Sequence, residues 1–68
     1  SPLTVSALLG RTEITLEELL RLQRGDIIPL DAPAVGNPVT IYVENTRWAK
    51  ATVGVKKKKY AVKIVEAL

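Results

Sequence analysis

The sequence predicts a small, mostly β domain with one short helix. Most apolar residues recur at every second position within short segments, and turn-forming residues separate these segments. Only one segment has the three- and four-residue spacing of a helix. The chain has 68 residues, enough for one domain at most. It has no Cys and no His, so we expect no disulfide, metal site or cofactor.

The first two elements follow from the segment over residues 3–25. Leu3, Val5, Ala7 and Leu9 alternate with mainly polar residues, which predicts a strand. A short helix should follow, because Thr15 and Glu18 have the spacing of a capping box. Its apolar face is formed by leucines at positions 16, 19 and 20. Gly25 is predicted to end the helix in a left-handed conformation.

The remaining segments predict four more strands. The first is "DIIPL" over residues 26–30, with Pro29 at an edge or a bulge. A loop rich in Pro, Gly and Asn precedes "PVTIYVE" over 38–44, and a turn follows at Asn45 and Thr46. The last two predicted strands, over 47–55 and 60–68, complete an antiparallel meander.

Charge is distributed unevenly along the chain. Residues 1–34 carry three basic and five acidic side chains, a net charge of −2, whereas residues 35–68 carry seven basic and two acidic, a net charge of +5. The run Lys56–Lys59 supplies most of this difference. We interpret the run as a solvated hairpin turn, a four-residue loop around a type I turn, because it lacks the Asn or Gly of a two-residue primed turn.

Catalytic chemistry is not expected in this chain. The seven carboxylates fall at predicted caps, turns and strand ends, and the four glycines form no phosphate-binding pattern. Nucleic-acid binding is not expected either, because the basic run has only Tyr60 and Trp48 as candidate stacking residues.

The segment "LGRTEITLEELLRLQRGDIIPLD", with the later "PVTIYV" and "VGV" followed by "YAVKI", resembles the SpoA domain. This domain ends the flagellar motor switch proteins FliM and FliN and occurs in C-ring proteins of type III secretion. The resemblance implies a barrel of about five strands with one short helix, formed by two intertwined (swapped) chains. It implies a non-enzymatic module of the cytoplasmic ring that switches flagellar rotation, peripheral to the inner membrane at the basal body. Because the chain begins at Ser1, we expect a single domain over 1–68, cut from a longer protein.

Within this family, "GDIIPLD" and the "VGV…YAVKI" ending are more similar to FliM. The FliN region that matches Val53 to Lys56 is an apolar docking patch for export proteins, and Gly54 and Lys56 interrupt it here. The resemblance implies a homodimer, or a heterodimer with a FliN-type domain, together with other C-ring and export-apparatus proteins. It implies no direct membrane insertion. A FliN or type III secretion domain that docks export components is the alternative.

The predicted interface residues are the apolar residues of the strands and the helix. The dimer or core set is Leu3, Val5, Leu9, Ile14, Leu16, Leu19, Leu20, Ile27, Ile28, Val39, Ile41, Val43, Val62 and Ile64, and a docking surface for further partners would contain Trp48, Val53 and Val55. An AbrB-like swapped-hairpin DNA-binding domain also fits "LLRLQRGDII", although the acidic residues around the helix argue against it. An enzyme domain that takes its chemistry from another chain has no support in the residues.

Overall fold

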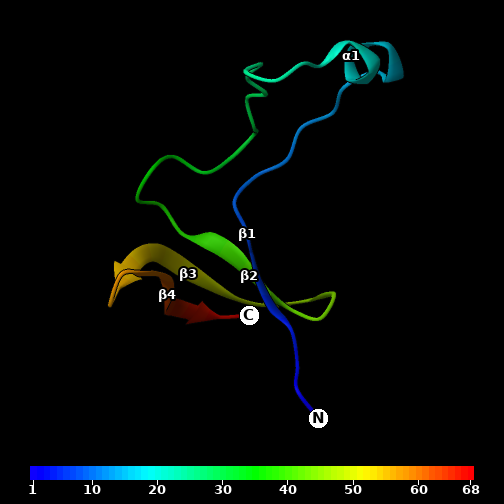
Figure 1. The fold of residues 1–68 in the computed structure, drawn as a ribbon. Helices are drawn as coiled ribbons and strands as arrows, with labels where there is room; N and C mark the ends of the chain where they lie inside the picture. The colour runs from blue at the N-terminus through cyan, green and yellow to red at the C-terminus, as the bar shows by residue number, and fades with distance from the viewer.

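The computed structural model describes all 68 residues, which form one antiparallel sheet and a long arm that carries a short helix (Figure 1). The elements are β1 (Val5–Leu8), α1 (Leu16–Arg21), β2 (Val39–Val43), β3 (Thr46–Lys56) and β4 (Lys59–Ala67). The strands lie in the order β1-β2-β3-β4, and every neighbouring pair is antiparallel. The predicted mostly β fold with one short helix is therefore confirmed.

The register places apolar residues on one face of the sheet. Paired residues share a face, and the pairs that cross the sheet on the apolar side are Ala7 with Ile41, Ile41 with Ala49, Val39 with Ala51, Ala51 with Ile64, Val53 with Val62, and Val55 with Tyr60. The opposite face is mainly polar. On it, the Lys50 ammonium donates a hydrogen bond of 2.9 Å to the Thr40 hydroxyl on the neighbouring strand.

Two irregularities bend the sheet. Trp48 has no partner in β2, because Ile41 pairs with Ala49 while Tyr42 pairs with Arg47. One strand further, the register between β3 and β4 shifts after Lys50. An extra residue of this kind locally increases the right-handed twist of a sheet. The long hairpin of β3 and β4 is therefore curved, as Figure 1 shows.

The turn between β3 and β4 differs from the prediction. Lys56 pairs directly with Lys59, so the loop contains only Lys57 and Lys58, with φ of 51° and 65°. Two positive φ angles in a two-residue loop define a primed turn, so the predicted four-residue loop is wrong. A primed turn matches the twist of the flanking strands, and here that twist prevails over the preference of lysine for negative φ.

The helix begins as the sequence predicts. The Glu18 backbone amide donates to the Thr15 hydroxyl at 3.0 Å, and the Thr15 amide donates to the Glu18 carboxylate at 3.3 Å, which completes the capping box. The helix ends earlier than predicted, at Arg21 with the extended residue Leu22 as its cap. Gly25 has φ of 94° but belongs to a separate turn, closed by a hydrogen bond from the Asp26 amide to the Gln23 carbonyl.

The predicted strand over 26–30 is absent. Only Asp31, just beyond it, forms an isolated bridge, exchanging backbone hydrogen bonds of 3.2 and 2.8 Å with Arg11. This bridge closes the base of the arm over residues 9–31. Gly10 allows the close approach, since a Cβ at this position would lie 2.7 Å from the Ala32 Cβ and 2.8 Å from the Asp31 carbonyl oxygen. Isoleucines 27 and 28 have no neighbouring strand in the chain to pair with, which explains the incorrect prediction.

The core of the single chain is very small. Only Val39, Ile41, Ala49 and Ala51 are buried, all in the middle of β2 and β3. The radius of gyration is 14.9 Å, whereas a compact domain of this length has about 11 Å. The residues form no helix with the length and hydrophobicity of a membrane span.

Candidate assembly surface

The apolar face of the sheet surrounds an open hollow of about 580 Å³. All eight lining residues are apolar or aromatic, and they come from all four strands and the residue after β1. They are Val5, Ala7, Leu9, Ile41, Val53, Tyr60, Ala61 and Val62, and we call this surface the apolar hollow. No element of the same chain covers it, because α1 stands far from the sheet at the end of the arm (Figure 1).

The amount of exposed surface is abnormal for a chain of this size. A compact monomer of 7.4 kDa exposes about 4,200 Å², whereas this chain exposes 6,409 Å². Twenty-one large hydrophobic side chains are exposed, and they lie on the sheet, the arm and the chain ends alike. Single exposed apolar residues are ordinary on proteins, but contiguous apolar surfaces mark interaction sites.

The structure separates the predicted dimer or core residues into two groups. Val39 and Ile41 are buried within the chain, and Val43 is half-buried. The other eleven are exposed in the single chain: Leu3, Val5, Leu9, Ile14, Leu16, Leu19, Leu20, Ile27, Ile28, Val62 and Ile64. Their place in an interface between chains remains a prediction.

The leucine face of α1 illustrates this result. Leu16, Leu19 and Leu20 are 70%, 53% and 77% exposed, although their spacing is that of a helix face which packs against another element. A six-residue helix is not stable through its own hydrogen bonds. The Glu17–Arg21 ion pair at 2.7 Å joins two exposed side chains and adds little. The helix therefore needs a packing partner that the single chain does not supply.

The predicted docking residues do not form one patch. Val53 lines the apolar hollow, and Val55 lies two residues further along the same face. Trp48 is half exposed, but it lies at the bulge near the start of β3. Val53 is five positions further along the extended strand, a distance of roughly 17 Å.

Sequence reasoning missed several residues of this surface. Ala7, Tyr60 and Ala61 line the apolar hollow but were not among the predicted site residues. The period-two pattern that contains Val62 and Ile64 also contains Tyr60, so this residue was available from the sequence. Ala7 likewise belongs to the period-two pattern of Val5 and Leu9, whereas Ala61 pairs with Gly54 and alternates with Tyr60 and Val62, so that pattern does not include it.

The ionisable side chains form no comparable site. The structure brings together no group of three or more His, Cys, Asp or Glu residues that could hold a metal ion. A polar depression at the base of the arm is lined by Arg11, Thr12, Glu13 and Asp31. The dominant surface of the chain is therefore apolar and open, the form expected of a domain that is covered by another protein chain.

Comparison with known structures defines the class of fold. The crystal structure of YscQ-C from Yersinia pseudotuberculosis matches 98% of this chain and 78% of its own chain, with a TM-score of 0.76 and 22% sequence identity. At this identity the similarity establishes a shared fold.

Comparison of sequences then defines the family. The family model described as "Type III flagellar switch regulator (C-ring) FliN C-term" matches residues 1–68, so the chain belongs to this family of flagellar C-ring domains. The flagellar motor switch protein FliN of Escherichia coli is 37% identical over 67 residues, which cover 98% of this chain and 48% of FliN. The flagellar motor switch protein FliM of Thermotoga maritima is 41% identical over 63 residues, which cover 93% of this chain and 19% of FliM. The chain thus spans about half the length of the FliN relative.

Proposed function

We propose that this chain is an assembly module of the flagellar C-ring, which pairs with a second domain of the same fold through the apolar hollow. The family membership supports the ring, and the uncovered apolar face supports the pairing. The observation that carries the proposal is the core of only four buried residues beside twenty-one exposed large hydrophobic ones. Such a chain lacks the apolar burial that a domain of this size needs to fold alone.

The surface areas give the size of the proposed interface. Two separate chains expose twice 6,409 Å², whereas a compact protein of twice the mass exposes about 7,000 Å². The difference, about 5,800 Å², lies in or just above the range of obligate dimer interfaces. A ring module held by such an interface would be a permanent dimer.

The pairing that we propose is intertwined. The arm leaves the sheet after β1 and returns before β2, and it carries seven of the eleven exposed interface candidates: Leu9, Ile14, Leu16, Leu19, Leu20, Ile27 and Ile28. In a swapped dimer each arm lies across the sheet of the partner, and the two chains together close the barrel. The open four-stranded sheet in Figure 1 would then be half of the closed unit.

The identity of the partner depends on the branch of the family. The sequence pattern favours FliM, but the similar proteins are mainly named FliN, so we propose a FliM/FliN-type module without choosing FliM. A second copy or a FliN-type domain would supply the same apolar strand face. Light scattering on the chain alone and mixed with a FliN-type domain distinguishes the two.

The remaining parts of the proposal follow from family membership. The module would be non-enzymatic and would act at the cytoplasmic side of the basal body. We do not propose DNA binding. The region before and in α1 that would contact phosphates in an AbrB-like domain carries Glu13, Glu17 and Glu18. A DNA binder would show an affinity that falls steeply with salt.

The test places a charge in the apolar hollow. Val53→Asp should convert the dimer into a monomer at micromolar concentration, because pairing would bury an unpaired carboxylate. Thr52→Asp is the matched control, since Thr52 lies on the opposite face and pairs with Lys63. The measurement is mass by light scattering. A wild-type mass of 7.4 kDa at every concentration would refute the proposed pairing.

A further inference from the structure

We propose that the acidic end of the arm docks on the lysine hairpin of the partner copy, an inference that rests on the proposed pairing. The acidic end comprises residues 12–20, and the lysine hairpin is the turn Lys56–Lys59 with its adjoining strand ends. The contact would combine the leucines of α1 with the apolar side of the hairpin, and the carboxylates of the arm with the lysines.

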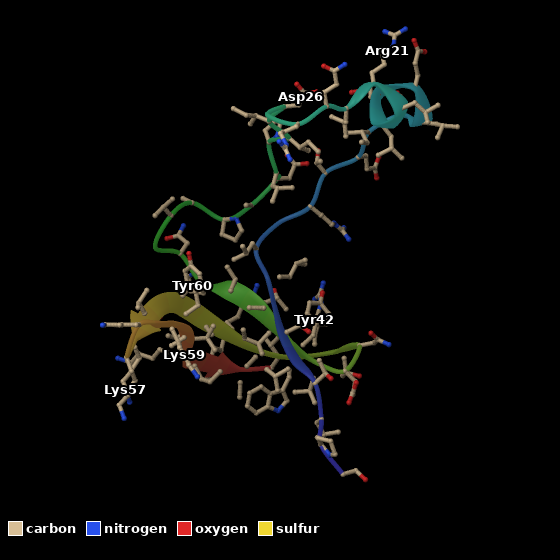
Figure 2. The ribbon with its side chains drawn as sticks, viewed as in Figure 1. Arg21, Asp26, Tyr42, Lys57, Lys59 and Tyr60 are labelled. Atoms are coloured by element: carbon tan, nitrogen blue, oxygen red, sulfur yellow. The ribbon has the colours of Figure 1, made fainter.

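The hairpin extends beyond the rest of its own sheet. β2 begins at Val39, which pairs with Ala51, so from Thr52 onwards β3 pairs only with β4. The apolar side of this extension carries Val53, Val55, Tyr60 and Val62, all exposed. Figure 2 shows Lys57 and Lys59 at its tip, at the opposite end of the molecule from Arg21 on α1.

The hairpin tip is unfavourable for the stability of the single chain in two independent ways. Lys57 and Lys58 both adopt positive φ, a conformation that costs non-glycine residues free energy. Lys56 and Lys59 are direct cross-strand partners, and like charges in such pairs repel. The sole ion pair in the chain joins Glu17 to Arg21, so no carboxylate compensates these lysines. Local strain of this kind is characteristic of functional sites.

The arm has the complementary composition. Residues 12–20 contain three acidic side chains, Glu13, Glu17 and Glu18, and no basic one. Glu18 is occupied by the capping box and Glu17 pairs with Arg21, so Glu13 is the carboxylate without a partner, and Glu17 would share its charge between Arg21 and the lysines. The leucines of α1 are exposed beside them. The bridge between Arg11 and Asp31 closes the base of the arm, which therefore projects from the sheet (Figure 1).

A second copy satisfies more of these observations than any other ligand. A membrane surface or a nucleic acid would neutralise the lysines but would leave the leucines of α1 exposed. Each copy carries a net charge of +3, so two copies repel unless acidic and basic regions face each other. Docking of the arm of one copy on the hairpin of the other would cover the leucines, give the strained lysines carboxylate partners and place the acidic and basic regions face to face.

The test exchanges the charges between two variants of the full 68-residue chain. Variant one is Lys57→Glu with Lys58→Glu, and variant two is Glu13→Lys with Glu17→Lys. Each variant alone should dimerise about 10-fold more weakly at low salt, an effect expected of a few exposed ion pairs. In an equal mixture, one contact of the mixed dimer joins an unchanged acidic arm to an unchanged lysine hairpin, and the other joins a basic arm to the two carboxylates introduced at the hairpin tip, whereas each variant alone has no unchanged contact. Native mass spectrometry should therefore show mixed dimers about 10-fold above the statistical proportion, and 1 M salt should abolish this excess.

Each outcome discriminates between the two proposals. Dimers of wild-type stability that mix statistically would overturn the docking contact but leave the proposed pairing intact. Monomers of the wild-type chain at all concentrations would refute the pairing itself. Statistical mixing together with Lys57- and Lys58-dependent binding to phosphatidylserine vesicles or to duplex DNA would assign the hairpin to that ligand instead. The variant Lys57→Asn with Lys58→Gly removes the two charges and suits the turn, so it controls for misfolding. It should dimerise more weakly than the wild-type chain at low salt, without lower cooperativity of unfolding.

Discussion

At the scale of single residues, the two lysines in the primed turn are the clearest departure from intrinsic preference. Lys57 and Lys58 have φ of 51° and 65°, where the favoured residues are Asn and Gly. Lys57→Asn with Lys58→Gly should therefore raise the free energy of unfolding by about 1–2 kcal/mol. Urea denaturation monitored by Trp48 fluorescence, at fixed protein concentration and in high salt, provides the measurement.

The control for this prediction separates backbone strain from charge repulsion. Lys56→Gln with Lys59→Gln removes the same number of charges at two positions whose φ is negative. If this variant gained as much stability as the turn variant, charge repulsion and not the positive φ would be the cause. A gain confined to the turn variant identifies the backbone conformation.

At the scale of elements, the closed base of the arm depends on one glycine. A Cβ on Gly10 would lie 2.8 Å from the Asp31 carbonyl oxygen, a backbone atom that cannot move without disturbing the bridge to Arg11. Gly10→Ala should therefore destabilise the folded protein by about 1–3 kcal/mol. It should also speed hydrogen exchange at the Arg11 and Asp31 amides, which the bridge protects.

The matched control for the arm is Gly54→Ala. A Cβ at Gly54 meets no atom within 4 Å, and alanine suits a strand at least as well as glycine does. This variant should keep the stability and the exchange rates of the wild-type protein. Equal exchange rates at Arg11 in both variants would show that the bridge does not depend on the absence of a side chain at Gly10.

The elements also show what the sequence could predict. The capping box at Thr15 and the strands around Ile41 and Val62 were predictable, because their signals arise from local spacing that the fold preserves. The strand over 26–30 was not, because Ile27 and Ile28 satisfy a strand pattern while no segment of the same chain pairs with them. The primed turn was missed because the twist of β3 and β4, which residue preferences do not encode, determines it. Likewise, the spacing of Leu19 indicates an apolar contact but not which chain provides it.

At the scale of the whole molecule, folding and pairing should be one reaction. With four buried residues, the separate chain has too little core to form a stable cooperative monomer. The stability of an obligate dimer depends on concentration, and each tenfold dilution lowers it by about 1.4 kcal/mol. The shift in melting temperature is this decrease in free energy divided by the unfolding entropy of two 68-residue chains. It amounts to about 5 °C per tenfold dilution.

Circular dichroism melts at concentrations from about 1 to about 100 µM would reveal this dependence as a shift in melting temperature of roughly 10 °C. Val53→Asp should melt at a lower temperature and with less cooperativity, because it removes the pairing and not a contact of the small core. A melting temperature that does not change with dilution, together with a cooperative transition at a mass of 7.4 kDa, would show that one chain is complete. The arm would then have to fold back so that its exposed leucines pack on the apolar hollow of its own sheet, an arrangement different from that in Figure 1.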